Sequence, residues 1–288
     1  MKLIVIGGGC YGIYHSAQLY KAILNGKLPA DTRLIIVDRN AHPPALEKFG
    51  NAPQFEFVQS DWQEYLQKFF AETQNYNFAT HADSVQIVPA PFAPHLLFDW
   101  LQFAATKRLL ELGHSGIVIE RIGFEERTML PYEYFDPQKG NRYISRAGWK
   151  CPTACIEPRK CPALKDVRDW DLEEDVRRVA NGKLPVPSFT AAQRLSTANK
   201  PNSQSQSLPV SDNFASNPSP FEAVVTFTCH HFSHGIGTTP ARQLFDARER
   251  AVALALSLTT EHPVARLAVG TISRCHGVLA ALKISLPT

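Results

Sequence analysis

The chain has 288 residues, of which 44% are hydrophobic and 20% are charged. A chain of this length and composition can bury a sizeable core and, at about 150 residues per domain, suggests roughly two domains. Thirty Lys and Arg residues against 27 Asp and Glu residues leave a net charge of only +3, and the charges are scattered. No basic stripe that would track a nucleic-acid backbone is therefore expected.

The apolar segments are too short to cross a membrane. One of the longest uninterrupted ones, Ala251 to Leu256, falls far short of the ~20 residues of a spanning helix. The N-terminus passes from Lys2 through four apolar residues to Gly7, whereas a signal peptide has an apolar region of about 7 to 15 residues. We therefore expect a cytoplasmic protein with no membrane partner and no nucleic-acid partner.

The first 123 residues alternate between apolar runs and helical periodicity. Short apolar runs predict strands at residues 2–6, 33–37, 55–58, 84–88 and 116–120, and apolar spacing predicts helices at 13–24, 61–71 and 95–112. This alternation predicts an α/β fold with a doubly wound parallel sheet and right-handed crossovers.

A second unit is expected beyond residue 123. It begins with a cysteine-rich segment at 124–195, which contains a predicted helix at 171–180. Residues 196–220 are rich in Ser, Asn, Gln and Pro and predict a disordered insertion. Residues 221–288 predict a strand at 223–229, a helix at 240–258 and strands at 264–273 and 278–284, a β-α-β-β segment that completes an α+β second unit.

A glycine motif follows the first predicted strand. Gly7, Gly9 and Gly12 in the segment GGGCYG satisfy G-x-G-x-x-G at the point where a strand gives way to a helix. The first glycine allows a tight turn, the second lets the backbone approach a pyrophosphate, and the third permits close packing of helix and strand. The motif predicts a dinucleotide site.

Asp38, at the end of the second predicted strand, can accept hydrogen bonds from ribose hydroxyls and would repel a 2′-phosphate. This favours NAD(H) over NADP(H), although the neighbouring Arg39 leaves NADP(H) open. Through GGGCYG, Asp38 and the pair Ser60-Asp61, residues 1–120 resemble the Rossmann dinucleotide-binding superfamily. The placement of Asp61 is similar to the adenine-side acidic residue of TrkA-type domains. The resemblance implies a Rossmann-like fold and cofactor binding by these residues, but no particular activity.

Three cysteines lie within eleven residues. Cys151, Cys155 and Cys161 have the spacing C-x3-C-x5-C in a proline-stiffened loop, and three thiolates in a short loop can converge on zinc or an iron–sulfur cluster. We expect Cys229 as the fourth ligand, with Cys275 or a neighbouring histidine as alternatives. The other hypothesis is that these are reduced, unligated thiols.

Several other polar residues suggest no specific chemistry. Cys10, inside the glycine turn, is interpreted as a small residue tolerated at a variable position, with a reactive thiolate as the alternative. His230, His231 and His234 suggest either an exposed polar loop or a ligand set. Glu157 and Arg168 are expected to form a structural salt bridge.

Two functions fit these features. The first is an NAD(H)-binding oxidoreductase-like protein with a cysteine-ligated zinc or iron–sulfur centre, whose substrate and catalytic residues the sequence leaves unknown. The alternative is a non-catalytic nucleotide-sensing or scaffold protein with a structural zinc site. The sequence has no G-x-S-x-G, no H-E-x-x-H and no Walker lysine, so hydrolase, zincin and P-loop functions are not expected.

Overall fold

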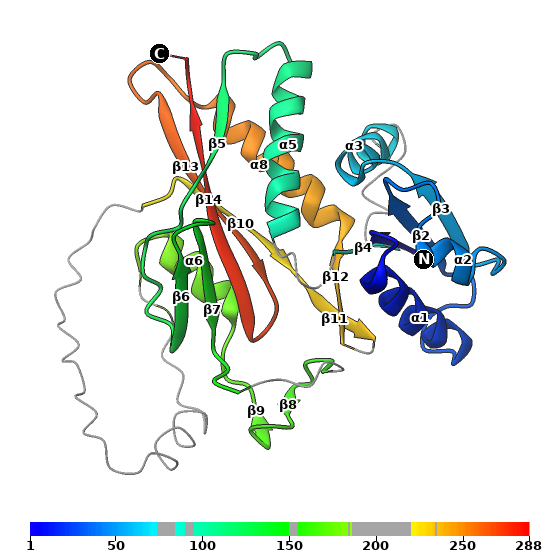
Figure 1. Cartoon of the computed structure of the whole chain (residues 1–288). Coiled ribbons are helices and arrows are strands. Elements are labelled where there is room, and N and C mark those ends of the chain that lie inside the picture. Colours follow the sequence, from blue (N-terminus) through cyan, green and yellow to red (C-terminus); the bar gives the residue numbers. More distant parts are fainter. Residues whose placement is uncertain are drawn as a thin grey trace.

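Two large β-sheets organise the chain in the computed structural model (Figure 1). The structure describes residues 1–73, 84–89, 95–149, 155–183, 185, 220–233 and 235–287. Cys151, His234 and nearly all of the predicted insertion at 196–220 lie outside the described residues.

Four adjacent parallel strands make up most of the first sheet, in the order β3-β2-β1-β4 with β3 at one edge. They are β1 (Lys2–Ile6), β2 (Arg33–Asp38), β3 (Phe55–Gln59) and β4 (Val85–Val88). Consecutive residues of β1, β2 and β4 are buried, because helices cover both faces of this sheet. The predicted parallel strands at 2–6, 33–37, 55–58 and 84–88 are thus confirmed.

A hairpin from the C-terminal half of the chain extends the first sheet. Its strands are β11 (His230–Ser233) and β12 (Ile236–Pro240), and β12 runs antiparallel to β4. The hairpin was not predicted, because its strands are short and their partner lies about 150 residues earlier in the sequence.

Helices cover the two faces of the first sheet. They are α1 (Cys10–Leu24), α2 (Pro44–Phe49), α3 (Trp62–Thr73), α5 (His95–Glu111) and α8 (Ala241–Leu256). Leu3 and Val5 of β1 pack in one core cluster with residues of α1 and α2. Ile4 and Ile6 point the other way and pack in a second cluster with residues of α3, α5 and α8.

The second sheet has the order β10-β13-β14-β7-β6, with β5 also paired to β14. Its strands are β5 (Val118–Ile122), β6 (Tyr132–Asp136), β7 (Asn141–Ser145), β10 (Ala223–Thr228), β13 (Val264–Ile272) and β14 (His276–Ser285). β10 and β13 are parallel, and the other pairs are antiparallel.

One continuous core joins the two sheets. Helices α5 and α8 lie between them, and their cluster includes Phe227, Val269 and Leu282 of the second sheet (Figure 1). The far face of the second sheet is covered by α6 (Leu172–Ala180), whose Val176 packs with a separate cluster. The molecule is therefore a mixed α/β structure with helices between and outside two sheets.

The prediction that residues 116–120 form a fifth strand of the parallel sheet is wrong. Residues 118–120 belong to β5, which pairs antiparallel with β14 in the second sheet. The edge of β4 that a fifth parallel strand would have used is occupied by β12.

Candidate functional site

The glycine turn between β1 and α1 has the conformation that its sequence predicts. Gly7 adopts a φ of +88° and its N–H donates to the Val37 carbonyl at 2.8 Å. A Cβ on Gly12 would lie 2.0 Å from the Gly7 carbonyl oxygen, so no larger residue fits there without moving the turn. Gly9 is the N-cap of α1, and no side chain of the described residues caps this helix. The turn therefore places the N-terminus of α1 beside the carboxyl end of β1.

Asp38 lies beside this turn at the end of β2. One carboxylate oxygen accepts the Gly8 N–H at 2.6 Å, and the other accepts the Asn40 N–H at 2.8 Å. Pro43 packs over Gly8, because a Cβ on Gly8 would come within 2.6 Å of it. The segment that follows β2 is thus fastened to the glycine turn, and Asp38 is held at a fixed orientation.

Asp61 begins α3. Its Oδ1 accepts the N–H groups of Gln63 and Glu64, and its Oδ2 accepts from Arg39 Nε at 2.7 Å. Burial alone would raise the pKa of Asp61, but these hydrogen bonds and the Arg39 charge together lower it. The structure gives Asp61 a capping role, and its predicted role at an adenine ring stays a prediction.

The cysteine loop contacts the two C-terminal segments that contain Cys229 and Cys275, the cysteines considered as the fourth ligand. Glu157 contacts the turn between β13 and β14, where its carboxylate accepts from the Ser273 hydroxyl at 2.8 Å and from the Arg274 N–H at 3.1 Å. The Cys155 carbonyl lies 2.8 Å from Nδ1 of His231 in β11. The contacts therefore bring residues 155–157 to both C-terminal segments.

Arg168 holds the other side of this loop. Its Nε donates to Cys275 Sγ at 3.2 Å, and another of its nitrogens donates to the Pro158 carbonyl. Burial alone would lower the pKa of Arg168, but the sulfurs of Cys275 and Cys161 and the Glu157 carboxylate raise it. The predicted Glu157–Arg168 salt bridge does not appear among the described ion pairs, because each residue binds a different part of the cluster.

The described cysteines differ in their surroundings. Cys161 and Cys275 are buried, with 2% and 1% exposure, and Cys155 Sγ accepts the Glu157 N–H at 3.4 Å. Cys229 Sγ lies 3.3 Å from the Thr239 hydroxyl, and burial raises the pKa of Cys229 to about 11. Among the residues that the structure describes, no three His, Cys, Asp or Glu side chains are arranged to hold a metal ion.

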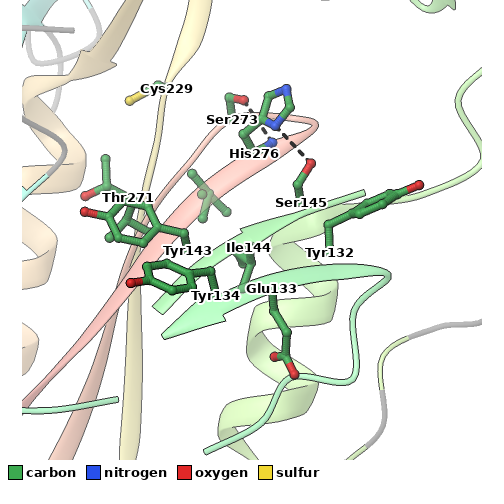
Figure 2. Close-up of a pocket in the computed structure, with 13 residues that line it drawn as sticks. Tyr132, Glu133, Tyr134, Tyr143, Ile144, Ser145, Cys229, Thr271, Ser273 and His276 are labelled. Carbon is green, nitrogen blue, oxygen red and sulfur yellow. Dashed lines mark hydrogen bonds between the residues drawn. The ribbon is translucent and has the colours of Figure 1, made fainter. Parts of the chain in front are cut away.

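A groove of about 660 Å³ opens beside Cys229, at the end of the second sheet (Figure 2). The sequence did not predict it. Its walls come from β6, β7, β13 and β14, and its lining includes Tyr134, Tyr143, Ser273 and His276. Because 118 residues separate the end of β7 from the start of β13, the convergence of these strands leaves no local sequence signal.

His276 borders this groove. Its Nδ1 is 2.9 Å from the Ser145 hydroxyl. Burial lowers the pKa of His276, outweighing the Glu157 carboxylate, which alone would raise it.

No helix of the described residues is long and apolar enough to span a bilayer.

The fold and these sites define a mixed α/β chain with a glycine turn on one sheet and a cysteine-lined loop against the other. A family model described as AF_1314_C, "Uncharacterized protein, C-terminal domain", matches residues 97–197 and 205–285. These residues are more than half of the chain, which belongs to this family. The match begins within α5 and leaves the glycine turn outside it. No curated protein and no solved structure matches the chain.

Proposed function

We propose that this chain is an NAD(H)-binding, oxidoreductase-like protein with a Rossmann-like first sheet and a cysteine-ligated metal ion or iron–sulfur centre in its second half. The observation that carries the proposal is the glycine turn. Gly12 packs so closely on the Gly7 carbonyl that a Cβ would lie 2.0 Å away, and this close approach is what the third glycine of a dinucleotide motif provides.

The order of the strands supports the same proposal. The chain moves outward from β1 to β2 and β3, then returns to β4 on the other side of β1. Ligands of open α/β sheets bind at the carboxyl ends of the strands where the order reverses. Here that position is between β1 and β4, where the glycine turn begins.

The residues at the turn fit the parts of a dinucleotide. Backbone N–H groups at the start of α1 would hold the pyrophosphate. Each oxygen of Asp38 accepts one backbone N–H and retains a lone pair for a ribose hydroxyl. When bound, the nicotinamide would supply or accept a hydride.

Replacing Asp38 tests the cofactor preference. We expect the wild type to bind NAD⁺ more tightly than NADP⁺ in isothermal titration calorimetry, because a carboxylate repels the 2′-phosphate. Asp38→Ala should reduce the ratio of the NAD⁺ and NADP⁺ affinities by about tenfold or more, which corresponds to a free-energy change of roughly 1.4 kcal/mol. Asp31→Ala, which removes an exposed carboxylate from the same half of the chain, should leave the ratio unchanged. Equal affinities in the wild type would contradict the assignment.

The proposed metal centre would draw its ligands from the cysteine loop and from the two C-terminal segments that contact this loop. Cys155 and Cys161 belong to the loop, and Cys275 contacts Arg168, which also donates to the Pro158 carbonyl of the loop. Cys229 immediately precedes β11, whose His231 contacts the Cys155 carbonyl. Thiolate and imidazole ligands suit zinc and iron–sulfur clusters. Such a centre would supply Lewis acidity in the case of zinc, or one-electron transfer in the case of a cluster.

Removing one cysteine tests this centre. We expect anaerobically purified wild type to contain stoichiometric zinc or iron, with broad visible absorption if iron is present. Cys155→Ser should lose both the metal and part of the thermal stability. The ligands come from distant segments and meet only in the folded chain, so the free energy of metal binding stabilises the fold. Cys10→Ser, at the exposed start of α1, should lose neither. Metal-free wild type prepared without chelator would contradict the proposal.

One observation favours the alternative of a non-catalytic protein with a structural zinc site. Cys161 and Cys275 are 2% and 1% exposed, and structural zinc sites are closed, whereas catalytic sites keep an open position. Stoichiometric zinc together with tight NAD(H) binding and no hydride transfer to any carbonyl compound tested would support this alternative.

A further inference from the structure

The groove beside Cys229 continues a face of the second sheet that is otherwise buried. Side chains alternate along a strand, so Val278, Ala280 and Leu282 of β14 lie on one face. Ala280 and Leu282 pack in the core cluster under α5 and α8. Val278 belongs to the groove, whose described lining residues come from strands and turns and from no helix. The groove is therefore the uncovered end of a core face.

At this uncovered end, the exposed face of the sheet carries tyrosines where its buried part carries aliphatic residues. Tyr143 pairs with Val278 across β7 and β14, and Tyr134 pairs with Tyr143 across β6 and β7. The rings of Tyr134 and Tyr143 are stacked, with centroids 6.3 Å apart and planes at 27° (Figure 2). Tyr134 is 64% exposed. A large aromatic pair is thus presented to solvent from the floor of a concave surface.

The groove carries little charge. Its described lining consists of hydroxyl, thiol, apolar and aromatic side chains together with the carboxylate of Glu133 and the imidazole of His276. Glu133 points away from the tyrosine rings (Figure 2), and its carboxylate binds Thr128 and pairs with Arg127 and Arg142. The aromatic end therefore offers no counter-charge to an ionic ligand, while Ser273 and the imidazole of His276 make the opposite end polar.

We propose that this groove binds a planar, uncharged fused-ring compound, whose rings stack on Tyr134 and Tyr143 and whose polar substituent reaches toward Ser273 and His276. A volume of about 660 Å³ is in the range of small-molecule sites, which combine apolar and aromatic walls with a few polar groups. Stacking on an aromatic side chain favours a flat ring system over a saturated one. The inference concerns binding alone and does not depend on the nucleotide or metal proposals.

Three probes of similar size test the proposal by isothermal titration calorimetry on the full chain. They are 2-naphthol, which is planar and uncharged, 2-naphthoate, which is planar and anionic, and 2-decalol, which is uncharged and saturated. We expect 2-naphthol to bind at least about tenfold more tightly than 2-decalol, since stacking on one ring contributes roughly that factor. It should also bind more tightly than 2-naphthoate, because the aromatic end of the groove offers no counter-charge to a carboxylate. Excess NAD⁺ should leave 2-naphthol binding unchanged, because the glycine turn lies on the other sheet.

Variants locate the site. Tyr134→Ala should weaken 2-naphthol binding about tenfold, and Tyr134→Phe, which keeps the ring, should bind within about twofold of the wild type. Because Tyr134 is mostly exposed, the alanine variant is expected to fold, which its melting temperature checks. Tyr14→Ala, which removes an exposed tyrosine from α1, is the control and should bind as the wild type does. Undiminished binding by Tyr134→Ala, preference for 2-naphthoate, displacement by NAD⁺ or no saturable binding would each overturn the proposal.

Discussion

His15 is a buried ionisable residue in the helix that follows the glycine turn. It is 5% exposed, and its Nδ1 has no hydrogen-bond partner among the described residues. Burial lowers the pKa of His15 below its ordinary value of 6.5, because the charged imidazolium would be poorly solvated there. The neutral form is therefore the one that the folded chain accommodates.

This burial predicts a pH dependence of stability. His15 takes up a proton at a higher pH in the unfolded chain than in the folded chain. The stability that neutral His15 contributes to the fold is therefore fully present above pH 6.5 and is lost as the pH falls through the lowered pKa. Between pH 7.5 and 5.5, the free energy of unfolding in urea should fall more steeply for the wild type than for His15→Leu. His262→Leu, which replaces an exposed histidine, should retain the wild-type slope. An unchanged slope in His15→Leu would refute this account.

Some site residues could be assigned a position from the sequence, and others could not. The glycine motif and Asp38 are local signals, since each sits at the end of an apolar strand. The capping of α3 by Asp61 is local, but the ion pair of Asp61 with Arg39, 22 residues away, forms only when β2 and β3 are paired. The contact between Arg168 and Cys275 spans 107 residues and has no local signal.

Among the secondary-structure elements, α6 is attached to the second sheet by a buried ion pair. Nε of Arg146 donates to one oxygen of Asp175 at 2.8 Å, and another guanidinium nitrogen donates to the second oxygen at 2.6 Å. Both side chains are at most 4% exposed. Removing one partner would leave a buried charge without its counter-ion.

Asp175→Ala should therefore destabilise the chain by about 3 to 5 kcal/mol in denaturant unfolding. The double variant Arg146→Met with Asp175→Leu should recover most of that loss, because it removes both charges and keeps the volume. Asp246→Ala, which breaks an exposed pair with Arg242 at 3.7 Å, should cost less than about 1 kcal/mol. A cost for Asp175→Ala no larger than for Asp246→Ala would contradict the role given to the pair.

Elements with a strong apolar pattern could be predicted, and edge strands could not. The parallel strands and α8 are largely buried, so their apolar spacing is complete. Strand β6 is an edge strand in which Tyr132 and Tyr134 are exposed, and its sequence therefore lacks a buried face. Residues 118–122 have a strand pattern that fits either sheet, and only the pairing with β14 decides between them.

At the scale of the whole molecule, the two halves of the chain exchange strands. Hairpin β11–β12 from the C-terminal half completes the first sheet, while β5 from the N-terminal half joins the second. The segment from Cys229 to His231 passes from one sheet to the other between β10 and β11. Cys229 consequently lies where the chain passes from the second sheet to the hairpin that extends the edge of β4.

Gly9 allows the nucleotide proposal to be tested without disturbing the fold. A Cβ on Gly9 would have no neighbour within 4 Å, and its φ of −74° suits any residue. Gly9→Ala should therefore lower the melting temperature by only a few degrees, as expected for a cost near 1 kcal/mol. The same methyl group would stand where a pyrophosphate must approach the backbone.

Titration of NAD⁺ into the wild type and Gly9→Ala by isothermal titration calorimetry tests the central claim most directly. We predict saturable binding to the wild type with one site per chain, and affinity at least about tenfold weaker for Gly9→Ala at nearly unchanged melting temperature. Gly26→Ala, in the turn after α1 where φ is +67°, provides a control that strains the backbone away from the site and should keep its affinity. Wild-type protein that binds no NAD⁺, or Gly9→Ala that binds as tightly as the wild type, would contradict the claim.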